Sequence, residues 1–300
     1  MTAQKPKKLI IAGNPNVGKS VLFGALTGKY ATVSNYPGTT VEVLRGPVRI
    51  GSDEYEVVDT PGMYSILPVT EEERVARDIL FSERPEVVVH VADARNVERM
   101  LPLTLQLVEA GLPVILALNI MDEAETEGVS IDIPTLEKEL GIPVVRAAFA
   151  KGRGLDELKA RIESTKSDAV SRAVTVDYPE PVERAMKEIT PLLPVDFFPG
   201  VSRRTVALLL AAMDENMLAD IERTEAAAGG EVRRIAGRLA DSNPAEPVGY
   251  RAVVRHREIS RRIATVVVPT SDVPPGFREK LSRIMMNPIT ICLIWSVTSI

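Results

Sequence analysis

Residues 13–20 constrain the fold of this chain more than any other segment. They read Gly-Asn-Pro-Asn-Val-Gly-Lys-Ser and follow an apolar, β-rich run at residues 8–12. A G-x-x-x-x-G-K-S pattern between a strand and a helix is typical of a phosphate-binding loop, in which backbone N–H groups and the positive end of the helix face an anion. The residues expected to hold phosphate are Gly13, Asn14, Asn16, Val17, Gly18 and Lys19. We expect the ammonium group of Lys19 to reach the β- and γ-phosphates of a nucleotide, and the hydroxyl of Ser20 to ligate Mg²⁺.

A second motif, Val-Val-Asp-Thr-Pro-Gly at residues 57–62, follows another predicted strand. Asp59 at the end of that strand is suited to orient Mg²⁺, and the N–H of Gly62 can reach a γ-phosphate. In isolation, Asp-Thr-Pro-Gly would be interpreted as a turn. Its place between the phosphate loop and a third motif favours a nucleotide site.

The third motif, Asn119-Ile-Met-Asp122, ends the apolar run at residues 113–118. A carboxylate at Asp122 can accept hydrogen bonds from both the ring N–H and the exocyclic amine of guanine, whereas adenine presents a different edge. Asn119 and Asp122 therefore predict GTP and GDP as ligands. Where a Ser-Ala turn usually completes the base pocket, this chain has Ala148 and Phe149. We expect backbone contacts at Ala148 and comparatively fast nucleotide release.

Thr39 and Thr40 lie between the first predicted helix and the following strand. One threonine there is expected to close over Mg²⁺ when the γ-phosphate is present, which would make the segment a switch. Thr40 is the preferred candidate. The alternative for either residue is a β-favouring side chain that begins the strand.

The residue after Gly62 is Met63, where Ras-like proteins carry a glutamine that orients water. Methionine cannot orient water, so we expect slow hydrolysis that uses backbone groups, another residue or an added cation. Arg45 and Arg74 are interpreted as solvated surface charges and not as arginine fingers.

The first 168 residues alternate β-rich runs with helical patterns, which predicts an α/β P-loop GTPase domain of the Ras-like type with a mainly parallel sheet. Strands are expected at residues 8–12, 41–50, 55–59, 87–93, 113–119 and 143–147, and helices at residues 18–27, 71–81, 97–109, 134–140 and 155–163. Thr70 and Glu73 have the spacing of a capping box at the start of the helix at 71–81.

Residues 169–286 are predicted to form an all-helical regulatory domain. Helices are expected at residues 181–193, 202–221, 231–240 and 251–263, with breaks at Pro194, Pro199-Gly200, Gly229-Gly230 and Pro244/Pro247. The final segment, residues 287–300, carries no charge from Pro288 onward. It is too short to span a bilayer, which takes about 20 apolar residues, so it is either a buried terminal element or the start of a first transmembrane helix.

Composition excludes several classes of protein. A net charge of −5 argues against nucleic-acid binding by bulk electrostatics, so no nucleic-acid partner is expected. One cysteine, Cys292, and two histidines, His90 and His256, leave neither a disulfide framework nor a Cys/His metal cluster. The N-terminus lacks the apolar core of a signal peptide, so we expect the start of the chain to be cytosolic.

With these motifs in place, the chain resembles the cytosolic N-terminal part of the ferrous-iron transport protein B family. The resemblance rests on residues 13–23 with 26–28, on residues 34–42 (Ser-Asn-Tyr-Pro-Gly-Thr-Thr-Val-Glu), and on residues 59–68 with 71–78. The last two stretches separate the chain from ribosome-assembly and tRNA-modification GTPases. Residues 278–288 also look like the family's approach to its first membrane helix, with Arg278, Lys280 and Arg283 on the cytosolic flank.

The resemblance implies a GTPase module of a bacterial inner-membrane Fe²⁺ transporter, located on the cytoplasmic face. It also implies a membrane transport domain beyond residue 300, a homo-oligomer formed through that membrane part, and a helical domain that restrains nucleotide release. In addition it implies that Asn16 and Asn35 help hold a potassium ion in place of an arginine finger. From the sequence alone, Asn16 could equally stabilise a turn. Lys19, Thr40, Gly62 and Asn16 are therefore the predicted catalytic residues.

Two other functions stay open at this point. A soluble GTPase that assists ribosome assembly or RNA modification could use the basic cluster Arg251, Arg255, Arg257, Arg261 and Arg262. Such a cluster is usually a solvated helix face, and no aromatic residues are interleaved for base stacking. A non-catalytic, GTP-dependent binding module is compatible with Met63.

Overall fold

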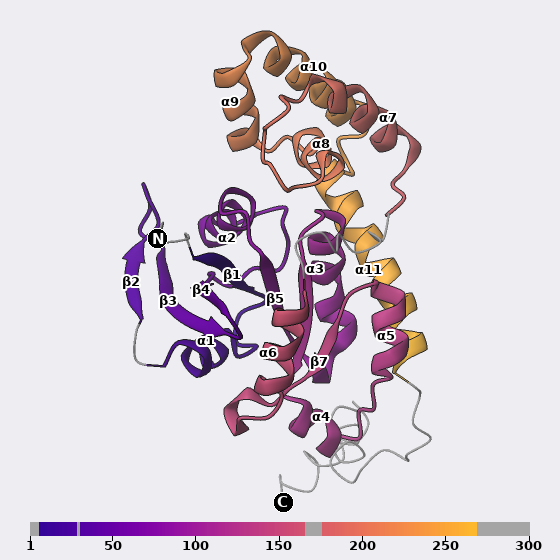
Figure 1. Ribbon diagram of the computed structural model, residues 1–300. Helices are drawn as coiled ribbons and strands as arrows, with labels where there is room; N and C mark the ends of the chain where they lie inside the picture. The colour runs from indigo at the N-terminus through magenta and orange to yellow at the C-terminus, as the bar shows by residue number, and fades with distance from the viewer. Residues whose placement is uncertain (1–5, 29–30, 166–175, 269–300) are drawn as a thin grey trace, which may run out of the picture.

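The computed structural model describes residues 6–28, 31–165 and 176–268. The first part of the chain folds around one sheet with the strand order β2-β3-β4-β1-β5-β6-β7 (Figure 1). Its strands are β1 (Lys7–Ala12), β2 (Thr32–Asn35), β3 (Glu42–Ile50), β4 (Asp53–Asp59), β5 (Val87–Asp93), β6 (Val114–Asn119) and β7 (Val144–Arg146). Strands β4, β1, β5, β6 and β7 run parallel, and β2 and β3 are antiparallel at one edge. The prediction of a mainly parallel sheet is confirmed.

The central strands are buried on both faces because helices cover the sheet on its two sides. Every residue of β5 and β6 is buried, which is the continuous apolar pattern expected of parallel strands. The flanking helices are α1 (Lys19–Thr27), α2 (Glu71–Ser82), α3 (Val97–Glu109), α4 (Met121–Thr126), α5 (Ile133–Leu140) and α6 (Leu155–Ser164). The carboxyl ends of parallel strands lie at the same edge of the sheet. Because the three predicted nucleotide motifs follow β1, β4 and β6, they meet at that edge.

Two elements of the first part were not predicted. Strand β2 reads Thr-Val-Ser-Asn and is exposed along its whole length, so it carries no apolar alternation that a pattern search could detect. It is defined by its antiparallel pairing with β3. Helix α4 has only six residues and begins inside the Asn119–Asp122 motif. Helices that short lack a readable amphipathic period.

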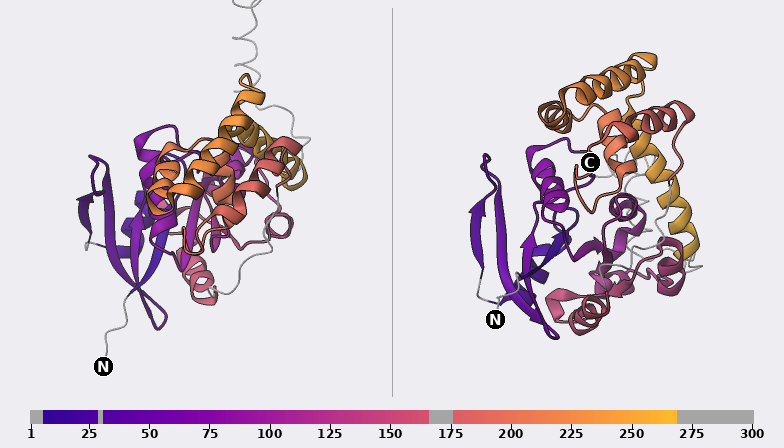
Figure 2. Two further views of the ribbon diagram at one scale, coloured as in Figure 1. Left: turned by 90° about the horizontal axis from the view of Figure 1, so that it is seen from above. Right: turned by 45° about the horizontal axis from the view of Figure 1, so that its top comes forward.

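The second part of the chain is helical. Its helices are α7 (Glu180–Ile189), α8 (Arg203–Ala211), α9 (Glu215–Thr224), α10 (Ala226–Ser242) and α11 (Val248–Val267), with a short 3₁₀ turn at Thr190–Leu192. Helices α7 to α10 gather at one end of the molecule, and α11 runs back from them along the nucleotide part (Figures 1 and 2). Helix α11 packs against α3 and α5. It therefore joins the two parts of the chain.

The predicted helix at residues 202–221 is wrong, because the chain breaks between α8 and α9. Met213 adopts a left-handed backbone with φ of 62°. The carboxylate of Asp214 then caps α9 by accepting the N–H of Met217 at 3.1 Å. Because Asp is a strong N-cap residue, the capping signal was present in the sequence but was outweighed by the long apolar run.

The predicted break at Gly229-Gly230 is also wrong, since both glycines lie inside α10. A Cβ atom at Gly229 would lie 2.6 Å from the Cα of Glu222 on α9. Glycine at this position therefore permits the close approach of two helices and does not end one. The predicted helix at 251–263 is longer in the structure and spans 20 residues.

The expected boundary between residues 168 and 169 falls outside the described residues, as do the segment 287–300 and Cys292. The two-domain division with those limits stays a prediction. Within the described ranges, no helix is both long enough and apolar enough to cross a membrane.

Candidate nucleotide-binding site

The phosphate loop connects β1 to the N-terminus of α1. Gly18 has a φ of 95°, and a Cβ atom there would lie 2.4 Å from the side-chain nitrogen of Asn119. Only glycine satisfies both the left-handed backbone and the close contact. Asn16 also has a positive φ, of 63°, and is exposed.

Lys19 begins α1 and is only 8% exposed. Its ammonium group donates a hydrogen bond to the backbone oxygen of Asn14 at 2.8 Å, which folds the side chain back over the loop. Burial lowers the pKa of Lys19, and the negative charge of Asp59 opposes that shift. A lysine held across a phosphate-binding loop is positioned to meet phosphate oxygens.

Ser20 and Asp59 lie together although they are 39 residues apart in the sequence. The hydroxyl of Ser20 donates to Asp59 Oδ2 at 2.9 Å, and Asp59 is 6% exposed. Burial raises the pKa of Asp59, while the Ser20 hydrogen bond and the charge of Lys19 lower it. Asp59 Oδ1 is buried and has no hydrogen-bond partner in the described part of the chain. A hydroxyl beside a buried carboxylate with a spare oxygen fits Mg²⁺, which prefers oxygen ligands.

The segment after Asp59 lies against the phosphate loop. The N–H of Met63 donates to the backbone oxygen of Gly13 at 3.1 Å, and a Cβ atom at Gly62 would lie 2.7 Å from the Pro15 side chain, so Gly62 lies beside the loop. The Met63 side chain is fully buried in the core. Its thioether is a weak hydrogen-bonding group enclosed in the core.

Asn119 links the phosphate loop to the turn after β7. Its side-chain nitrogen donates to the backbone oxygen of Val17 at 2.9 Å, and its side-chain oxygen accepts the N–H of Phe149 at 2.9 Å. Asn119 is 4% exposed. One amide thus fixes the distance between two loops that come from distant parts of the chain.

Asp122 lies at the start of α4 and contacts Lys151, with a distance of 2.5 Å between Nζ and Oδ2. The hydrogen bond from Lys151 lowers the pKa of Asp122, so the carboxylate stays ionised and can accept hydrogen bonds. Lys151 was not among the predicted site residues. Its position two residues after Phe149, in the turn predicted to complete the base pocket, could have indicated that it lies near Asp122.

The turn with Ala148 is formed by backbone groups. The N–H of Ala148 donates to the backbone oxygen of Arg153 at 3.2 Å, and the N–H of Lys151 donates back to Ala148 at 2.8 Å. The Ala148 side chain has no polar atom to offer. The turn is nevertheless well anchored, because Phe149 is bound to Asn119.

The predicted switch residues lie apart from this cluster. Thr39 is held in a local turn, since its hydroxyl donates to the backbone oxygen of Tyr36 at 3.0 Å and accepts the N–H of Val41 at 3.2 Å. Thr40 is exposed, and Asn35 is exposed on β2. Within the described ranges, no hydrogen bond joins Thr40 or Asn35 to the phosphate loop. The structure therefore brings together Lys19, Ser20, Asp59 and Asn119, but not these two residues.

A further set of contacts holds the loop at residues 64–70 between Met63 and α2. Glu73, only 6% exposed, accepts the N–H groups of Tyr64 and Val69, and Gln106 on α3 accepts from Ser65 and Ile66. Of the predicted capping box, the Thr70 half is present, because its hydroxyl accepts the N–H of Glu73 at 3.2 Å. The Glu73 side chain, which would complete the capping box, instead accepts hydrogen bonds from the loop at residues 64–70.

Arg45 and Arg74, which were interpreted as solvated surface charges, are only partly solvated. The guanidinium of Arg45 is paired with Glu83 and Glu56, and that of Arg74 is paired with Glu71 and Asp78. Their side chains are only 24% and 28% exposed. Both arginines are therefore engaged in ion pairs with carboxylates of their own chain.

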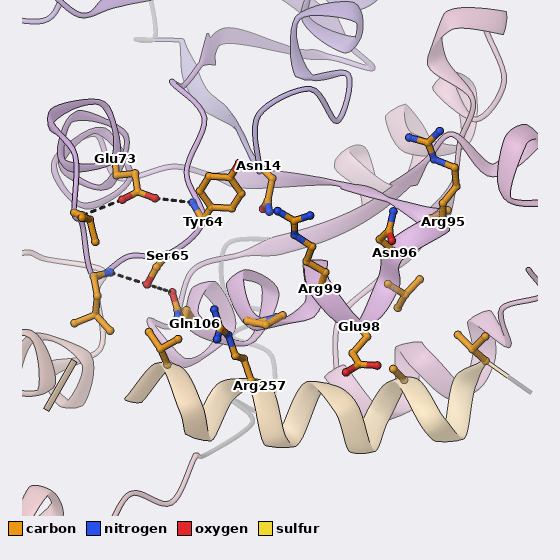
Figure 3. Close-up of a pocket in the computed structure, with 18 of the residues that line it drawn as sticks. Asn14, Tyr64, Ser65, Glu73, Arg95, Asn96, Glu98, Arg99, Gln106 and Arg257 are labelled. Atoms are coloured by element: carbon orange, nitrogen blue, oxygen red, sulfur yellow. Dashed lines mark hydrogen bonds between the residues drawn. The ribbon is translucent and has the colours of Figure 1, made fainter. Parts of the chain in front are cut away.

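A cavity of about 1120 Å³ lies apart from most of the nucleotide motifs. It lies between the loop at residues 64–70, α3 and α11, and only Asn14 comes from the phosphate loop (Figure 3). Among the described residues, no group of three or more His, Cys, Asp or Glu side chains could hold a metal ion.

Comparison with known proteins identifies the family. A sequence model described as ferrous iron transport protein B matches residues 7–162, more than half of the chain. The Fe(2+) transporter FeoB of Escherichia coli (strain K12) is 36% identical over 214 residues, which are 69% of this chain and 27% of that protein. A Porphyromonas gingivalis Fe(2+) transport protein A/Fe(2+) transporter FeoB fusion protein is 40% identical over 186 residues, 61% of this chain and 22% of that protein. The chain thus spans about a quarter of the length of these relatives.

Solved structures agree with this assignment. A mutant of S. thermophilus NFeoB bound to GDP has a TM-score of 0.75 and 32% identity, covering 88% of this chain and 100% of that one. The cytosolic domain of the T. maritima FeoB iron transporter in its GMPPNP form has a TM-score of 0.72 and 32% identity, covering 88% of this chain and 99% of that one. The chain belongs to the ferrous iron transport protein B family.

Proposed function

We propose that this chain binds GTP with Mg²⁺, hydrolyses it slowly to GDP and phosphate, and thereby regulates a ferrous-iron pathway in a membrane domain beyond residue 300. It would act at the cytoplasmic face of a bacterial inner membrane. The observation that carries the nucleotide part is the Asn119 amide, which bonds Val17 of the phosphate loop and Phe149 of the base-side turn. The iron part is carried by the family, whose relatives are named as Fe(2+) transporters.

Each chemical task of GTP binding and hydrolysis has a candidate residue. Lys19 and the N–H of Gly62 would contact the β- and γ-phosphates, and Asn119 and Asp122 would read guanine. Ser20 and Asp59 would ligate Mg²⁺, with Thr40 joining them when the switch loop closes. When bound, Mg²⁺ neutralises charge on the transferring phosphoryl group. Catalysis of phosphoryl transfer depends mostly on positioning the reacting groups. The chain's own contribution would be to hold the phosphates of GTP in one fixed orientation.

Slow hydrolysis with potassium activation belongs to the same proposal. Met63 is buried and cannot orient water. Asn16 is exposed at the loop, and its side chain makes no hydrogen bond within the described part of the chain. Its amide oxygen is therefore free to ligate a potassium ion, and Asn35 would complete that site after the switch loop moves.

The soluble RNA-assisting GTPase is not favoured. Arg251 and Arg255 of the basic cluster bond backbone oxygens of Glu246 and Asp177. Helix α11, which carries the cluster, packs along α3 and α5. Two of the five arginines are therefore engaged within the helical part of the chain, and the family to which the chain belongs does not favour an RNA-assisting role.

Single-turnover hydrolysis of radiolabelled GTP tests the proposal. We expect phosphate release that needs Mg²⁺, is inhibited by GDP but not ADP, and is several-fold faster in KCl than in NaCl. Asn16→Ala should remove the difference between the two salts while leaving GDP affinity within about twofold. GTP binding without phosphate release would instead indicate a non-catalytic binding module, and equal rates in both salts would remove the potassium site.

A further inference from the structure

A second candidate site is the cavity between the loop at residues 64–70, α3 and α11 (Figure 3). Its volume of about 1120 Å³ slightly exceeds the roughly 300–1,000 Å³ of typical ligand pockets. Most of its wall surface is apolar, with contributions from Tyr64, Val97 and Val253, and polar groups lie at a few points. The size and the lining of the cavity therefore suit a small organic ligand.

Two arginines reach into this cavity from different helices. Figure 3 shows Arg99 extending from α3 toward Asn14, and Arg257 extending from α11 toward Gln106. Both arginines are exposed, and within the described part of the chain neither guanidinium group makes an ion pair or a hydrogen bond. Two positive charges therefore line the same cavity without a partner.

The remaining charged side chains of the walls do not neutralise these two arginines. Arg95 is paired with Asp93 and Glu123, at 2.8 Å and 2.6 Å. Glu73 accepts two backbone N–H groups of the adjacent loop. Glu98 is exposed, and in the described ranges it forms no ion pair. The walls thus carry two unpaired guanidinium groups against one unpaired carboxylate, which favours an anionic ligand.

Asn14 gives a second and independent indication of a ligand. Its backbone belongs to the phosphate loop, but its side chain lines this cavity and is only 4% exposed. The side-chain oxygen of Asn14 is buried and has no hydrogen-bond partner among the described residues. Because a buried acceptor without a donor is unfavourable, we expect a ligand that brings a hydroxyl or amino group to this oxygen.

The charges indicate which anion the cavity takes. A guanidinium group presents a planar set of donors that matches the oxygens of phosphate. A phosphate monoester carries a charge of about −1.5 to −2 at pH 7, which balances two guanidinium groups better than the single charge of a carboxylate. The ring of Tyr64, whose exposed fraction is 52%, offers an aromatic surface against which a ring of the ligand can pack.

We propose that this cavity binds a small organic phosphate. Arg99 and Arg257 hold the phosphate, Asn14 accepts a hydrogen bond from a hydroxyl or amino group of the ligand, and the apolar walls enclose the rest of the molecule. This site is separate from the guanine-nucleotide site and does not depend on GTP hydrolysis.

Isothermal titration calorimetry with ADP and with inorganic phosphate tests the site. ADP is the main probe because it combines phosphates with a ring, hydroxyl groups and an amino group. The chain is first saturated with GDP, so that the guanine-nucleotide site is filled before ADP is added.

We expect saturable binding of ADP with a Kd of about 1 mM or tighter. Inorganic phosphate should bind more weakly and compete with ADP, because it supplies the charge but no contact with the apolar walls. Adenosine, which lacks the phosphates, should not bind measurably. Absence of saturable binding for both ADP and inorganic phosphate would overturn the proposal.

Substitution of the two arginines tests where ADP binds. Arg99→Gln and Arg257→Gln should each weaken ADP binding by about tenfold, because each removes a charged hydrogen-bond donor to the phosphate. Arg261→Gln is the matched control. Arg261 is also an exposed arginine of α11 without an ion pair in the described part of the chain, but it does not line the cavity. Unchanged ADP affinity in both Arg99→Gln and Arg257→Gln would refute the assignment.

NMR of the arginine side chains locates the ligand in the unmodified chain. The Nε–H signals that vanish in Arg99→Gln, Arg257→Gln and Arg261→Gln assign these three residues. On addition of ADP to the GDP-saturated chain, the signals of Arg99 and Arg257 should shift together, with the same dependence on ADP concentration, while the signal of Arg261 stays in place. Shifts confined to other arginines would place the ligand elsewhere and contradict the proposal.

Discussion

At the residue scale, some predicted site residues already lie close to the phosphate loop, whereas Thr40 and Asn35 would reach it only if the switch loop moved. Ser20, Asp59, Lys19 and Asn119 lie within hydrogen-bond reach of one another or of the phosphate loop. The sequence could place them because their motif spacing follows from strand ends meeting at one edge of a parallel sheet. Lys151 could not be placed, since its partnership with Asp122 depends on how one turn folds back.

Asp122→Asn should exchange guanine preference for xanthine preference. In the proposed role, the carboxylate would accept two hydrogen bonds from guanine, and an amide would present a donor where an acceptor is needed, at a cost of about 1–3 kcal/mol. We therefore expect roughly 10- to 100-fold weaker GDP binding and measurable binding of xanthosine diphosphate in fluorescence competition assays. Lys151→Ala is the matched control, since it removes the carboxylate's partner but not the carboxylate. Unchanged preference for GDP in Asp122→Asn would mean that another residue reads the base.

Asp59 gives a pH prediction with a definite sign. Burial raises the pKa of Asp59 in the folded chain. In the absence of metal, the folded chain therefore holds a proton that the unfolded chain would release. The contribution of Asp59 to the free energy of unfolding then falls as the pH rises. Mg²⁺ competes with that proton. In Mg²⁺ titrations of GTP hydrolysis, the half-saturating concentration should therefore rise as the pH is lowered from 8 to 5.5. Asp59→Asn should need far more Mg²⁺ and lose this dependence, whereas a pH-independent requirement in the unmodified chain would count against Asp59 as a ligand.

At the element scale, agreement was best where periodicity was long and uniform. Helix α3 has the bounds that the sequence predicts, because thirteen residues give a clear apolar stripe. The failures have local causes. Strand β2 is polar and depends on its partner strand, and the break before α9 follows from one residue with positive φ and one capping aspartate.

Adjacent glycines in α10 provide a sharp test of helix packing. Alanine is favoured over glycine in a helix by about 1 kcal/mol. Gly230→Ala should show that gain in urea unfolding, because no heavy atom lies within 4 Å of its added Cβ. Gly229→Ala should instead destabilise the chain, because its Cβ would lie 2.6 Å from the Glu222 backbone and force α9 and α10 apart. Equal stabilisation by both substitutions would show that the close approach of α9 and α10 is not required.

At the scale of the whole molecule, buried polar contacts and one long helix join the parts of the chain. Tyr178 and Thr205 donate hydrogen bonds to Glu109 of α3, and Arg77 of α2 pairs with Asp214 at the start of α9. The sequence could not predict this ion pair, because its members are 137 residues apart and each reads as an ordinary helix residue. Its position gives the helical part a direct connection to the helix that follows the loop at residues 64–70.

Asp214→Asn should therefore affect both stability and nucleotide release. Asparagine can still cap α9, but Arg77, whose side chain is only 2% exposed, would keep a single carboxylate partner, Asp78. Removing one partner of a buried pair costs up to about 3 kcal/mol here, because the remaining carboxylate compensates in part. We expect this loss in urea unfolding, together with faster release of fluorescent GDP measured by stopped flow. Arg223→Ala, which removes an exposed pair with Asp220, is the control and should cost less than about 1 kcal/mol. If Asp214→Asn lowers stability while GDP release stays unchanged, the pair holds the parts together without transmitting their state to the nucleotide.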